Sequence, residues 1–441
     1  MRPVVAPSPQ PVVPAVPPAS DRTTLLDRLK RHPLAQLGPG LITGVADDDP
    51  SGVATYSQAG AAYGLGMLWT MPVAFPLMSA IQILAARLGR VTGKGLAANM
   101  RLAFPGWIVT TLVILLLVAN TLNIAADIAA MGETAELVGG VSRRVMIALF
   151  VAVTLILQIF VPYHRYVLFL KWLTLSLLAY AAVLFAVHVP WGETLRQTVF
   201  PHFRLDGAAA TMIVAIFGTT ISPYLLFWQA SEEIEDLRGA PPLREDPSAA
   251  KAELSRIGWD TWSGMLYSNL ASYFIILATG VTLHAAGITQ IDTAAEAAAA
   301  LRPLAGAGAS TVFAAGILGV GFIGVPVLAG SAGYALCEAM GWKWGLDRNA
   351  NDARAFYTII AVSVLLALVL QFLPISPMRA LFWSAVINGV VAIPLIIVLM
   401  ILASRAGVMG AFTAPRPLIW LAGAAAGLMG IAAVVMVAGF F

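Results

Sequence analysis

The chain has 441 residues, of which 59% are hydrophobic and 11% are charged, and its formal net charge at pH 7 is +3. A soluble domain carries about 25% charged residues, so this composition excludes an ordinary soluble protein and indicates one that crosses a membrane several times. The one cysteine, Cys337, excludes an internal disulfide and a metal site built from several cysteines. The small net charge gives no indication of nucleic-acid binding, because basic loops are usual in membrane proteins.

The first 33 residues predict a tail rather than a membrane segment. Residues 1–20 contain seven prolines, so they cannot form the apolar helix of a signal peptide. We expect residues 1–33 to be a disordered, Pro-rich cytoplasmic tail. Eleven apolar segments follow, and they predict an all-α integral membrane protein with a single transmembrane domain over residues 34–441. The segments lie at about 36–60, 64–86, 107–130, 143–162, 167–189, 208–231, 259–282, 311–336, 356–373, 379–402 and 418–440.

The basic residues are distributed unevenly between the two sides of these spans. If the N-terminus is inside and the spans alternate, 20 of the 26 Lys and Arg residues lie inside, including every Lys. The exceptions are Arg143, Arg144, Arg196, Arg204, Arg302 and Arg379. Because inside loops carry an excess of basic residues, we expect a multi-pass protein of the plasma (inner) membrane. Its N-terminus is then cytoplasmic and its C-terminus extracytoplasmic.

The first apolar segment has a polar interruption at its middle, Asp47-Asp48-Asp49-Pro50-Ser51-Gly52. Each carboxylate at a bilayer centre costs about 2.5–3.5 kcal/mol, so three of them do not face lipid. Proline removes an amide donor and clashes with the preceding turn, and glycine relaxes the backbone. The pattern therefore predicts a broken helix whose carbonyls and carboxylates line a polar cavity. A surface loop between two short helices is the alternative.

The sixth segment, residues 208–231, is interrupted in a similar way between Gly218 and Pro223. Spans one and six begin two candidate five-span halves, at about 36–189 and 208–402, which insert with opposite orientation because five is odd. Interrupted helices at matching positions of inverted halves indicate a transport site near the bilayer midplane. An ordinary proline kink in span six is the alternative, and the helix at about 418–440 lies outside both halves.

These motifs resemble the Nramp family of divalent-metal transporters, which has a LeuT-like fold of two inverted five-helix repeats. The matching residues of the first span are Gly38-Pro39-Gly40, Asp49-Pro50, Ala54-Thr55 and Gln58-Ala59-Gly60, and those of the sixth run from Gly218 to Pro223. The resemblance implies helices 1 and 6 unwound at mid-membrane, an eleventh helix outside the repeats, and a metal ion at the breaks.

Several positions depart from the family pattern. The family asparagine that follows the Asp-Pro pair by two residues is replaced by Gly52, and the methionine before the sixth-helix proline is replaced by Ser222. A family histidine is Tyr224, and a family glutamate of span three is Ala130, whereas Asp127 matches an acidic position. The combination resembles the Nramp-related magnesium-transporter branch.

The chemistry of the expected site follows from these replacements. Thioethers select softer metals, whereas carboxylate, carbonyl and hydroxyl oxygens suit Mg²⁺, Ca²⁺ or Mn²⁺. Mg²⁺ keeps several of its waters, and small residues leave room for them. The metal site is expected to comprise Asp49, Asp48, Ser222, the backbone carbonyls of Ala46 and Thr219, and the space beside Gly52.

Six further polar residues are candidates for an ion or proton path. They are Asp127, Tyr224, Asn269, Asn388, Glu232 and Glu233. Each has a structural alternative: a hydrogen bond within the bundle for Asp127, interhelical hydrogen bonds for the asparagines, and a solvated helix end for the glutamates.

The sequence thus predicts a secondary transporter or facilitator for hydrated hard divalent cations, Mg²⁺ first and Mn²⁺ as well, without proton coupling. It is not expected to be an enzyme or to hold a cofactor, the metal ion being the transported substrate. Its partners are that ion and the lipid bilayer, with no nucleic acid, and a monomer is favoured. The alternatives are a proton-coupled Mn²⁺/Fe²⁺ transporter of ordinary Nramp type, a sodium-coupled carrier of organic solutes and an intramembrane aspartyl enzyme using Asp49 and Asp127.

Overall fold

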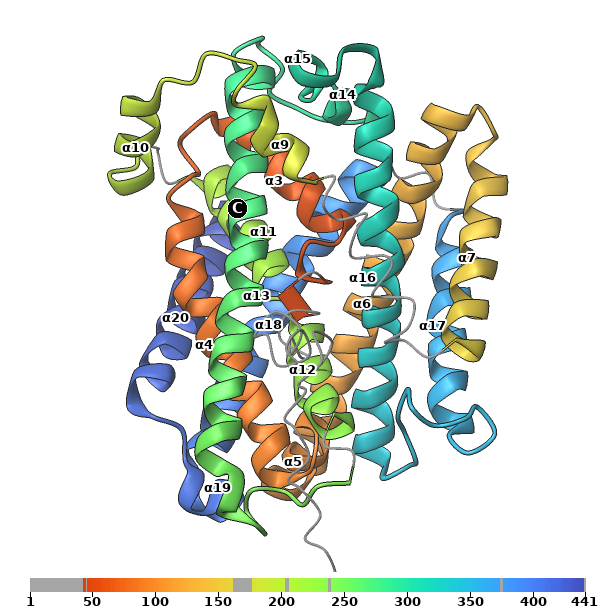
Figure 1. Ribbon diagram of the computed structural model, residues 1–441, viewed down its shortest axis with the longest axis vertical. Helices are drawn as coiled ribbons and strands as arrows, with labels where there is room; N and C mark the ends of the chain where they lie inside the picture. The colour runs from red at the N-terminus through yellow and green to blue at the C-terminus, as the bar shows by residue number, and fades with distance from the viewer. Residues whose placement is uncertain are drawn as a thin grey trace, which may run out of the picture. The chain divides into compact units, whose positions relative to one another are not determined.

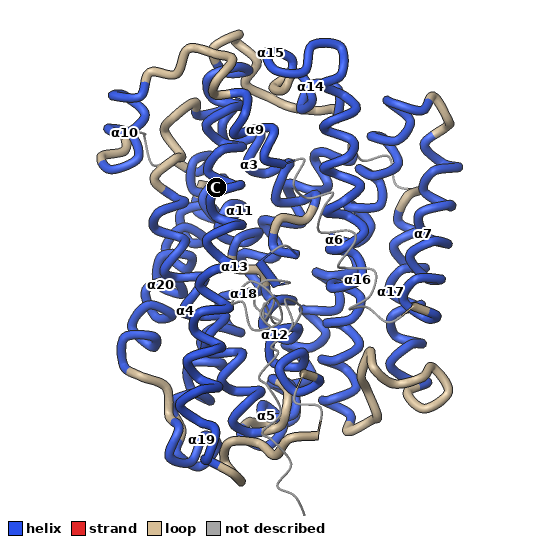
Figure 2. The backbone as a smooth tube through the Cα atoms, in the orientation of Figure 1, coloured by secondary structure: helices blue, strands red, loops and turns tan. Residues whose placement is uncertain are grey.

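The structure is a computed structural model that describes residues 43–44, 46–161, 177–202, 206–236, 239–372 and 376–439. The predicted tail over residues 1–33, the first residues of the first span and residues 167–176 of the fifth span lie outside these ranges. Throughout the described ranges the chain forms helices joined by loops, with no strand (Figure 2). The prediction of an all-α protein is therefore confirmed.

Within the described residues, eight helical segments are long and apolar enough to cross a membrane. Six are single helices: α4 (Thr70–Thr92), α6 (Gly106–Gly139), α7 (Arg143–Phe160), α13 (Ala250–Thr279), α18 (Pro377–Ser404) and α20 (Arg416–Ala438). The seventh is α16 (Ala309–Met340) with the short α15 (Arg302–Ala305) before it. The eighth is the pair α11 (Gly207–Thr220) and α12 (Pro223–Glu235). The shorter apolar helix α17 (Arg354–Leu370) matches the predicted ninth span.

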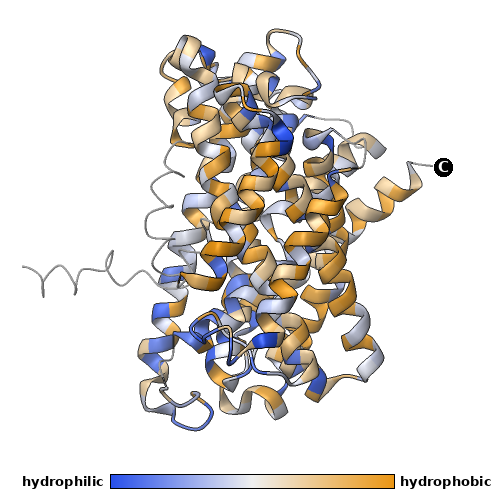
Figure 3. Ribbon diagram, turned by 90° about the vertical axis from the view of Figure 1, so that its right-hand side faces the viewer, coloured by the Kyte–Doolittle hydropathy of each residue, from blue (hydrophilic) through white to orange (hydrophobic). Residues whose placement is uncertain are grey.

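Shorter helices complete two of the predicted spans or connect one span to the next. α3 (Pro50–Tyr63) and α9 (Leu178–Val183) belong to the first and fifth predicted spans, and α13 continues into a π-helical turn at Gly280–His284. In Figure 1, α14 (Ala294–Ala299) and α15 lie at one end of the bundle, and α5 (Leu96–Ala103) and α19 (Ala406–Met409) lie at the other. α10 (Trp191–Val199) projects at the side. Figure 3 shows apolar residues along the middle of the helices and polar residues gathered near the ends.

The interrupted helices lie at the centre of the bundle. In the most apolar stretch of the α11–α12 segment 94% of residues are buried, against 28% in α7 and in α20. α11 packs on α18 and α20, α12 on α4 and α16, and α3 on α13 and α18. α7 and α17 stand together on one side, where they leave apolar side chains exposed. This arrangement puts the polar breaks inside protein and gives lipid the apolar outer helices.

Prolines determine where the second half of each broken helix begins. Pro50 is the first residue of α3 and Pro223 is the first residue of α12, a position where the missing N–H costs nothing. The extended residues just before them are Asp49 (φ −63°, ψ 171°) and Ser222 (φ −68°, ψ 132°). We predicted breaks near Asp49–Gly52 and Thr219–Pro223. Both breaks are confirmed, but Gly52 belongs to the first turn of α3, because the proline starts the helix two residues before it.

Candidate metal centre

Asp49 lies at the first break and both of its carboxylate oxygens are fully engaged. Its Oδ1 accepts hydrogen bonds from the Ser51 hydroxyl at 2.6 Å and from the Gly52 amide at 2.8 Å, which caps α3. Its Oδ2 accepts from Nδ2 of Asn123 at 2.9 Å and from the Tyr224 hydroxyl at 3.2 Å. A carboxylate offers about four acceptor positions. A cation that binds Asp49 must therefore displace one of these donors.

The two breaks lie against one another, as predicted. The Tyr224 hydroxyl at the start of α12 is 3.2 Å from the carbonyl oxygen of Ala46 and 3.2 Å from Oδ2 of Asp49. A second tyrosine joins the same helices, because the hydroxyl of Tyr56 on α3 is 3.0 Å from Oγ1 of Thr220 on α11. These contacts connect segments about 170 residues apart in sequence. The carboxylate of Asp49 thus faces a surface made by both broken helices.

Asp47 and Asp48 face a different helix from Asp49. The Ser268 hydroxyl of α13 lies 2.8 Å from Oδ2 of Asp47 and 3.0 Å from Oδ1 of Asp48, and the Ser272 hydroxyl lies 3.2 Å from the same Asp48 oxygen. Both aspartates are buried, at 0% and 1% exposure. Within the described ranges, no group of three or more His, Cys, Asp or Glu side chains is arranged to hold a metal ion. Any cation here therefore relies on hydroxyl and carbonyl oxygens or water as well.

The small residues at the breaks bring the two helices close together. A Cβ added at Gly52 would lie 3.2 Å from Oγ1 of Thr219 and 3.5 Å from the carbonyl oxygen of Asp47. Cε2 of the Tyr56 ring lies 3.3 Å from the same point, so two oxygens and an aromatic ring border the position where the family asparagine begins. The Ser222 hydroxyl donates to the carbonyl of Thr219 at 2.6 Å and approaches that of Gly218 at 3.1 Å. Ser222 thus satisfies one of the last carbonyls of α11, that of Thr219, and keeps its lone pairs for a ligand.

The third-span residues extend this polar centre. Asp127 on α6 is fully buried, and its Oδ2 is 3.5 Å from Nδ2 of Asn123, which also bonds Asp49. Asn123 was not among the predicted site residues. It precedes Asp127 by one helical turn, so the i, i+4 spacing was the available signal. Ser268 and Ser272 were also missed, because nothing in the sequence places α13 beside the first break.

Three predicted path residues have no recorded hydrogen bond with Asp49. Asn269 on α13 donates to the carbonyl of Met71 on α4 at 3.0 Å, which is the interhelical hydrogen bond given as its alternative. Asn388 on α18 is buried, and neither side-chain polar atom has a hydrogen-bond partner among the described residues. Glu232 follows the site along α12 and its Oε1 lies 3.5 Å from the Tyr334 hydroxyl. None of these three side chains therefore belongs to the set that hydrogen-bonds the Asp49 carboxylate.

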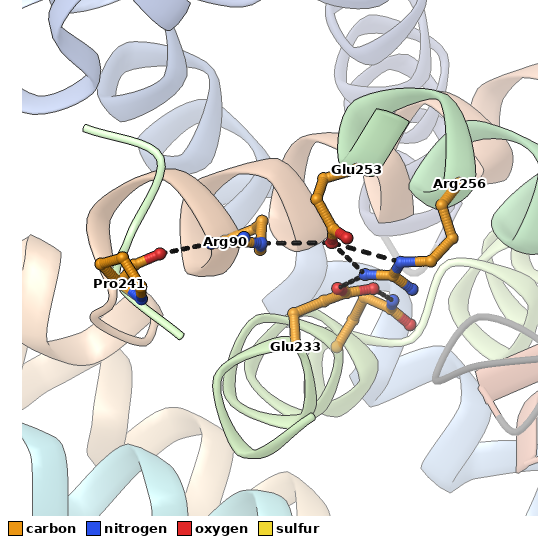
Figure 4. A network of polar contacts seen from close by, with 6 residues as sticks. Arg90, Glu233, Pro241, Glu253 and Arg256 are labelled. Atoms are coloured by element: carbon orange, nitrogen blue, oxygen red, sulfur yellow. Dashed lines mark hydrogen bonds and ion pairs between the residues drawn. The ribbon is translucent and has the colours of Figure 1, made fainter. Parts of the chain in front are cut away.

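Glu233 lies in an ionic network at the far end of α12 (Figure 4). Its Oε2 accepts from Arg256 of α13 at 2.6 Å, and its side chain is 0% exposed. Arg256 also approaches Glu253, and Glu253 accepts from Nε of Arg90 on α4 at 3.2 Å. Arg90 donates in addition to the carbonyl of Pro241 at 2.9 Å. The network ties α12 to α13, α4 and a loop, so the solvated helix end given as the alternative for Glu233 is wrong.

The two ends of the bundle differ in access to the breaks. On the side of the ionic network, the Thr43 hydroxyl before the first break donates to Oε1 of Gln229 on α12, which holds the two segments together. On the other side, a cavity of about 530 Å³ lies between α3, α11, α18 and the loop at residues 289–292. It reaches Ala54, one turn beyond the first break, and its other lining residues include Gln58, Thr211, Asp292, Arg379 and Trp383. This cavity thus extends toward the first break from the end that bears α14 and α15.

Comparison with known proteins agrees with this architecture. The family model described as natural resistance-associated macrophage protein-like (Nramp) matches residues 40–439, nearly the whole described chain. The protein belongs to the Nramp family. Its relatives include proteins named divalent metal cation transporter MntH. That of Acidiphilium cryptum is 28% identical over 421 residues, covering 85% of this chain and 91% of the relative, and that of Verminephrobacter eiseniae is 29% identical over 371 residues, covering 78% and 80%.

Solved structures of other proteins share the fold of this Nramp-family protein. The crystal structure of the Eremococcus coleocola manganese transporter superposes with a TM-score of 0.72 at 16% identity, covering 94% of this chain and 89% of that one. The inward-facing conformation of Mhp1 superposes with a TM-score of 0.55 at 13% identity, covering 90% and 91%. The fold is therefore LeuT-like, with two inverted five-helix repeats, an eleventh helix, and helices 1 and 6 unwound at the breaks. The protein is a multi-pass membrane protein.

Proposed function

We propose that this Nramp-family protein is a secondary transporter of divalent metal cations that binds one ion where the two broken helices meet. The relatives named divalent metal cation transporters cover most of the chain, which supports the substrate class. The cavity on one side of the breaks and the ionic network on the other suit a protein that opens to one side at a time. Transport by alternating access around a fixed central site then follows.

The preferred substrate is proposed to be a hard cation, Mg²⁺ first and Mn²⁺ as well. One observation carries this proposal: hydroxyl and carbonyl oxygens lie at the two positions where the family has asparagine and methionine. They are Oγ1 of Thr219 and the Asp47 carbonyl oxygen beside Gly52, and the hydroxyl of Ser222. Such an oxygen set suits Mg²⁺ and Mn²⁺. The proposed ligands are Asp49, Ser222 and the Ala46 and Thr219 carbonyls, completed by water. Asp48, expected from the sequence as a further ligand, directs its Oδ1 to Ser268 and Ser272 of α13 instead.

Cation uptake is proposed to proceed without accompanying proton flux. A tyrosine at position 224 does not change charge near neutral pH, unlike the family's histidine. Ala130 likewise offers no carboxylate where the family has glutamate. Asp127 is the remaining acid of that helix near the site, linked to it through Asn123. It is therefore the residue through which protons would pass if uptake were coupled.

We also propose an orientation of the protein in the membrane. Arg90, Lys94, Arg101, Lys251 and Arg256 lie on the segments at the end that bears α5 and the start of α13. Since basic residues concentrate on the inside, this end is proposed to be cytoplasmic and the cavity beside α3 extracytoplasmic. The protein then belongs in the plasma membrane and acts as a monomer on the metal ion.

Uptake into proteoliposomes tests these proposals together. We expect Mg²⁺ and Mn²⁺ to enter vesicles that hold the full-length protein and a pH dye, without a change of internal pH. Asp49→Ala should abolish uptake, and because Asp49 caps α3 it should also lower stability by about 1 kcal/mol. Normal uptake by Asp49→Ala would place the site elsewhere. Acidification that disappears in Asp127→Asn would instead establish proton coupling, and strong Cd²⁺ binding with no response to millimolar Mg²⁺ would refute a hard-cation site.

A further inference from the structure

The two carboxylates on the α13 side of the break share too few hydrogen-bond donors. The Ser268 hydroxyl contacts both Asp47 and Asp48, but a hydroxyl has one proton and donates to only one of them at a time. The Ser272 hydroxyl is divided between Asp48 at 3.2 Å and the carbonyl of Ser268 at 3.0 Å. Oδ1 of Asp47 and Oδ2 of Asp48 have no hydrogen-bond partner in the described part of the chain.

Burial makes this arrangement costly without a positive charge. Asp47 and Asp48 are 0% and 1% exposed, and both approach the same hydroxyl within 3.0 Å. An unpaired buried charge is disfavoured by several kcal/mol, and two adjacent like charges add to that. In the described ranges, no Lys, Arg or His is recorded in a hydrogen bond or ion pair with either carboxylate. Protons or a cation would relieve this cost, and a single divalent cation relieves it for both carboxylates at once.

This pair is separate from Asp49. Asp49 directs its oxygens to Asn123 of α6 and Tyr224 of α12, whereas Asp47 and Asp48 direct theirs to α13. Each oxygen of Asp49 accepts at least one hydrogen bond, from Ser51 and Gly52 at Oδ1 and from Asn123 at Oδ2, while the α13-side pair retains unpartnered oxygens that are fully buried. One ion bound at Asp49 leaves the charges of the α13-side pair in place.

We propose that Asp47 and Asp48, with the hydroxyls of Ser268 and Ser272, bind a second hard divalent cation on the α13 side of the break. Carboxylate and hydroxyl oxygens completed by water form a suitable ligand set for Mg²⁺ or Mn²⁺. A divalent charge neutralises the pair, and two such ions balance the four buried carboxylates Asp47, Asp48, Asp49 and Asp127. Carboxylate-rich sites for two neighbouring divalent cations are common in proteins. The proposed transport function needs only one ion, so this inference goes beyond it.

The number of bound ions tests the second site directly. Mn²⁺ is titrated into the full-length protein in nanodiscs, with calorimetry for stoichiometry and electron paramagnetic resonance for the bound ion. We expect two Mn²⁺ per protein, with spectral broadening from their mutual proximity. Ser268→Ala/Ser272→Ala, which leaves every recorded contact of Asp49 intact, should weaken the second equivalent at least tenfold. Asp49→Ala should lose the other equivalent and the broadening.

A matched control and the opposing outcomes complete the test. Ser384→Ala removes a buried hydroxyl that donates only within its own helix, to the carbonyl of Leu381, and should leave both equivalents unchanged. One Mn²⁺ in the wild type, lost in Asp49→Ala and unaffected in the α13 double variant, would overturn the second site and leave the transport proposal standing. Displacement of the second equivalent by 100 mM Na⁺ would overturn its assignment as a divalent site. Binding of two Mn²⁺ ions without cation uptake into proteoliposomes would refute the transport proposal and leave the second site standing. The broadening is measured on the wild-type protein, so this part of the test does not depend on whether any variant folds.

Discussion

The hydroxyl of Tyr224 lies 3.2 Å from Oδ2 of Asp49 and so occupies the carboxylate that a metal ion is proposed to bind. The same hydroxyl lies 3.2 Å from the carbonyl oxygen of Ala46, a second proposed ligand. The single proton of this phenol is therefore divided between two oxygens of the first break. Metal binding and this pair of contacts compete, and the tyrosine is the natural donor to be displaced.

Tyr224→Phe should tighten divalent-cation binding at Asp49. A hydrogen bond to a charged group contributes about 1.5–3 kcal/mol, and about 1.4 kcal/mol corresponds to a factor of ten in affinity. We therefore expect a decrease of about tenfold in the Mn²⁺ dissociation constant of this site, measured by calorimetry. Tyr56→Phe is the matched control, because Tyr56 also joins the two broken helices but bonds Thr220 rather than Asp49. Weaker binding in Tyr224→Phe would mean that the phenol is a ligand and not a competitor.

Ser222→Met should raise the ratio of Cd²⁺ to Mg²⁺ binding. A thioether at this position adds a soft ligand, which favours Cd²⁺ over a hard cation. The substitution also removes the hydroxyl that satisfies the Thr219 carbonyl, so we expect stability to fall by about 1 kcal/mol. Displacement of bound Mn²⁺ by each metal gives the ratio. Ser222→Ala loses the same hydroxyl without gaining sulfur, and equal Cd²⁺ affinity in the two variants would refute the role of softness.

The positions of the helix breaks were predictable from the sequence because their causes are local. A proline fixes the first residue of a helix, and charges cannot face lipid, so Pro50, Pro223 and the three aspartates sufficed. The directions of those aspartates were not predictable. Three consecutive side chains diverge at an unwound backbone, and which partner each meets depends on the packing of α6 and α13. Ser268 lies 221 positions from Asp47, and no spacing rule connects them.

The role of Asn269 shows the same limit in another way. A polar residue within a predicted span indicates either a cavity or an interhelical hydrogen bond, and its sequence context is the same in both cases. Only the position of the Met71 carbonyl on α4 decides between them. By contrast, Asn123 was accessible to sequence reasoning, because it lies one turn before Asp127 on the same helical face.

Gly218→Ala should destabilise the protein, because α11 and α18 touch through their backbones at this residue. A Cβ at Gly218 would lie 2.1 Å from the carbonyl oxygen of Ala385 and 2.4 Å from the amide nitrogen of Gly389, so the helices must separate. Inserting a methyl group into such packing costs about 1–3 kcal/mol. Thermal unfolding in detergent measures the change. Gly258→Ala on α13 is the control, since nothing lies within 4 Å of its Cβ position, and it should be neutral or stabilising.

Arg256→Ala should be the most destabilising substitution in the ionic network, because it leaves the buried Glu233 without its partner. The Glu233 side chain is 0% exposed and its partner lies at 2.6 Å, so after removal of the arginine the carboxyl must either stay charged without compensation or take up a proton. Breaking a buried pair from one side costs about 3–5 kcal/mol when the remaining charge stays, which is the upper limit expected here. Arg256→Ala/Glu233→Gln removes the stranded charge as well, so it should recover most of the loss. Thermal and denaturant unfolding of the single and double variants give the comparison.

The exposed pair of α10 provides the control for this cycle. Arg196 holds the pKa of Glu193 down to about 2, so that pair is also ionised at neutral pH. Both side chains are more than 40% exposed, and water screens their attraction. Arg196→Ala should therefore leave the unfolding midpoint unchanged, whereas Arg256→Ala lowers it. If Arg256→Ala and its double variant with Glu233→Gln unfold alike, the cost arises from lost arginine packing at the end of α12 and not from a buried unpaired carboxylate.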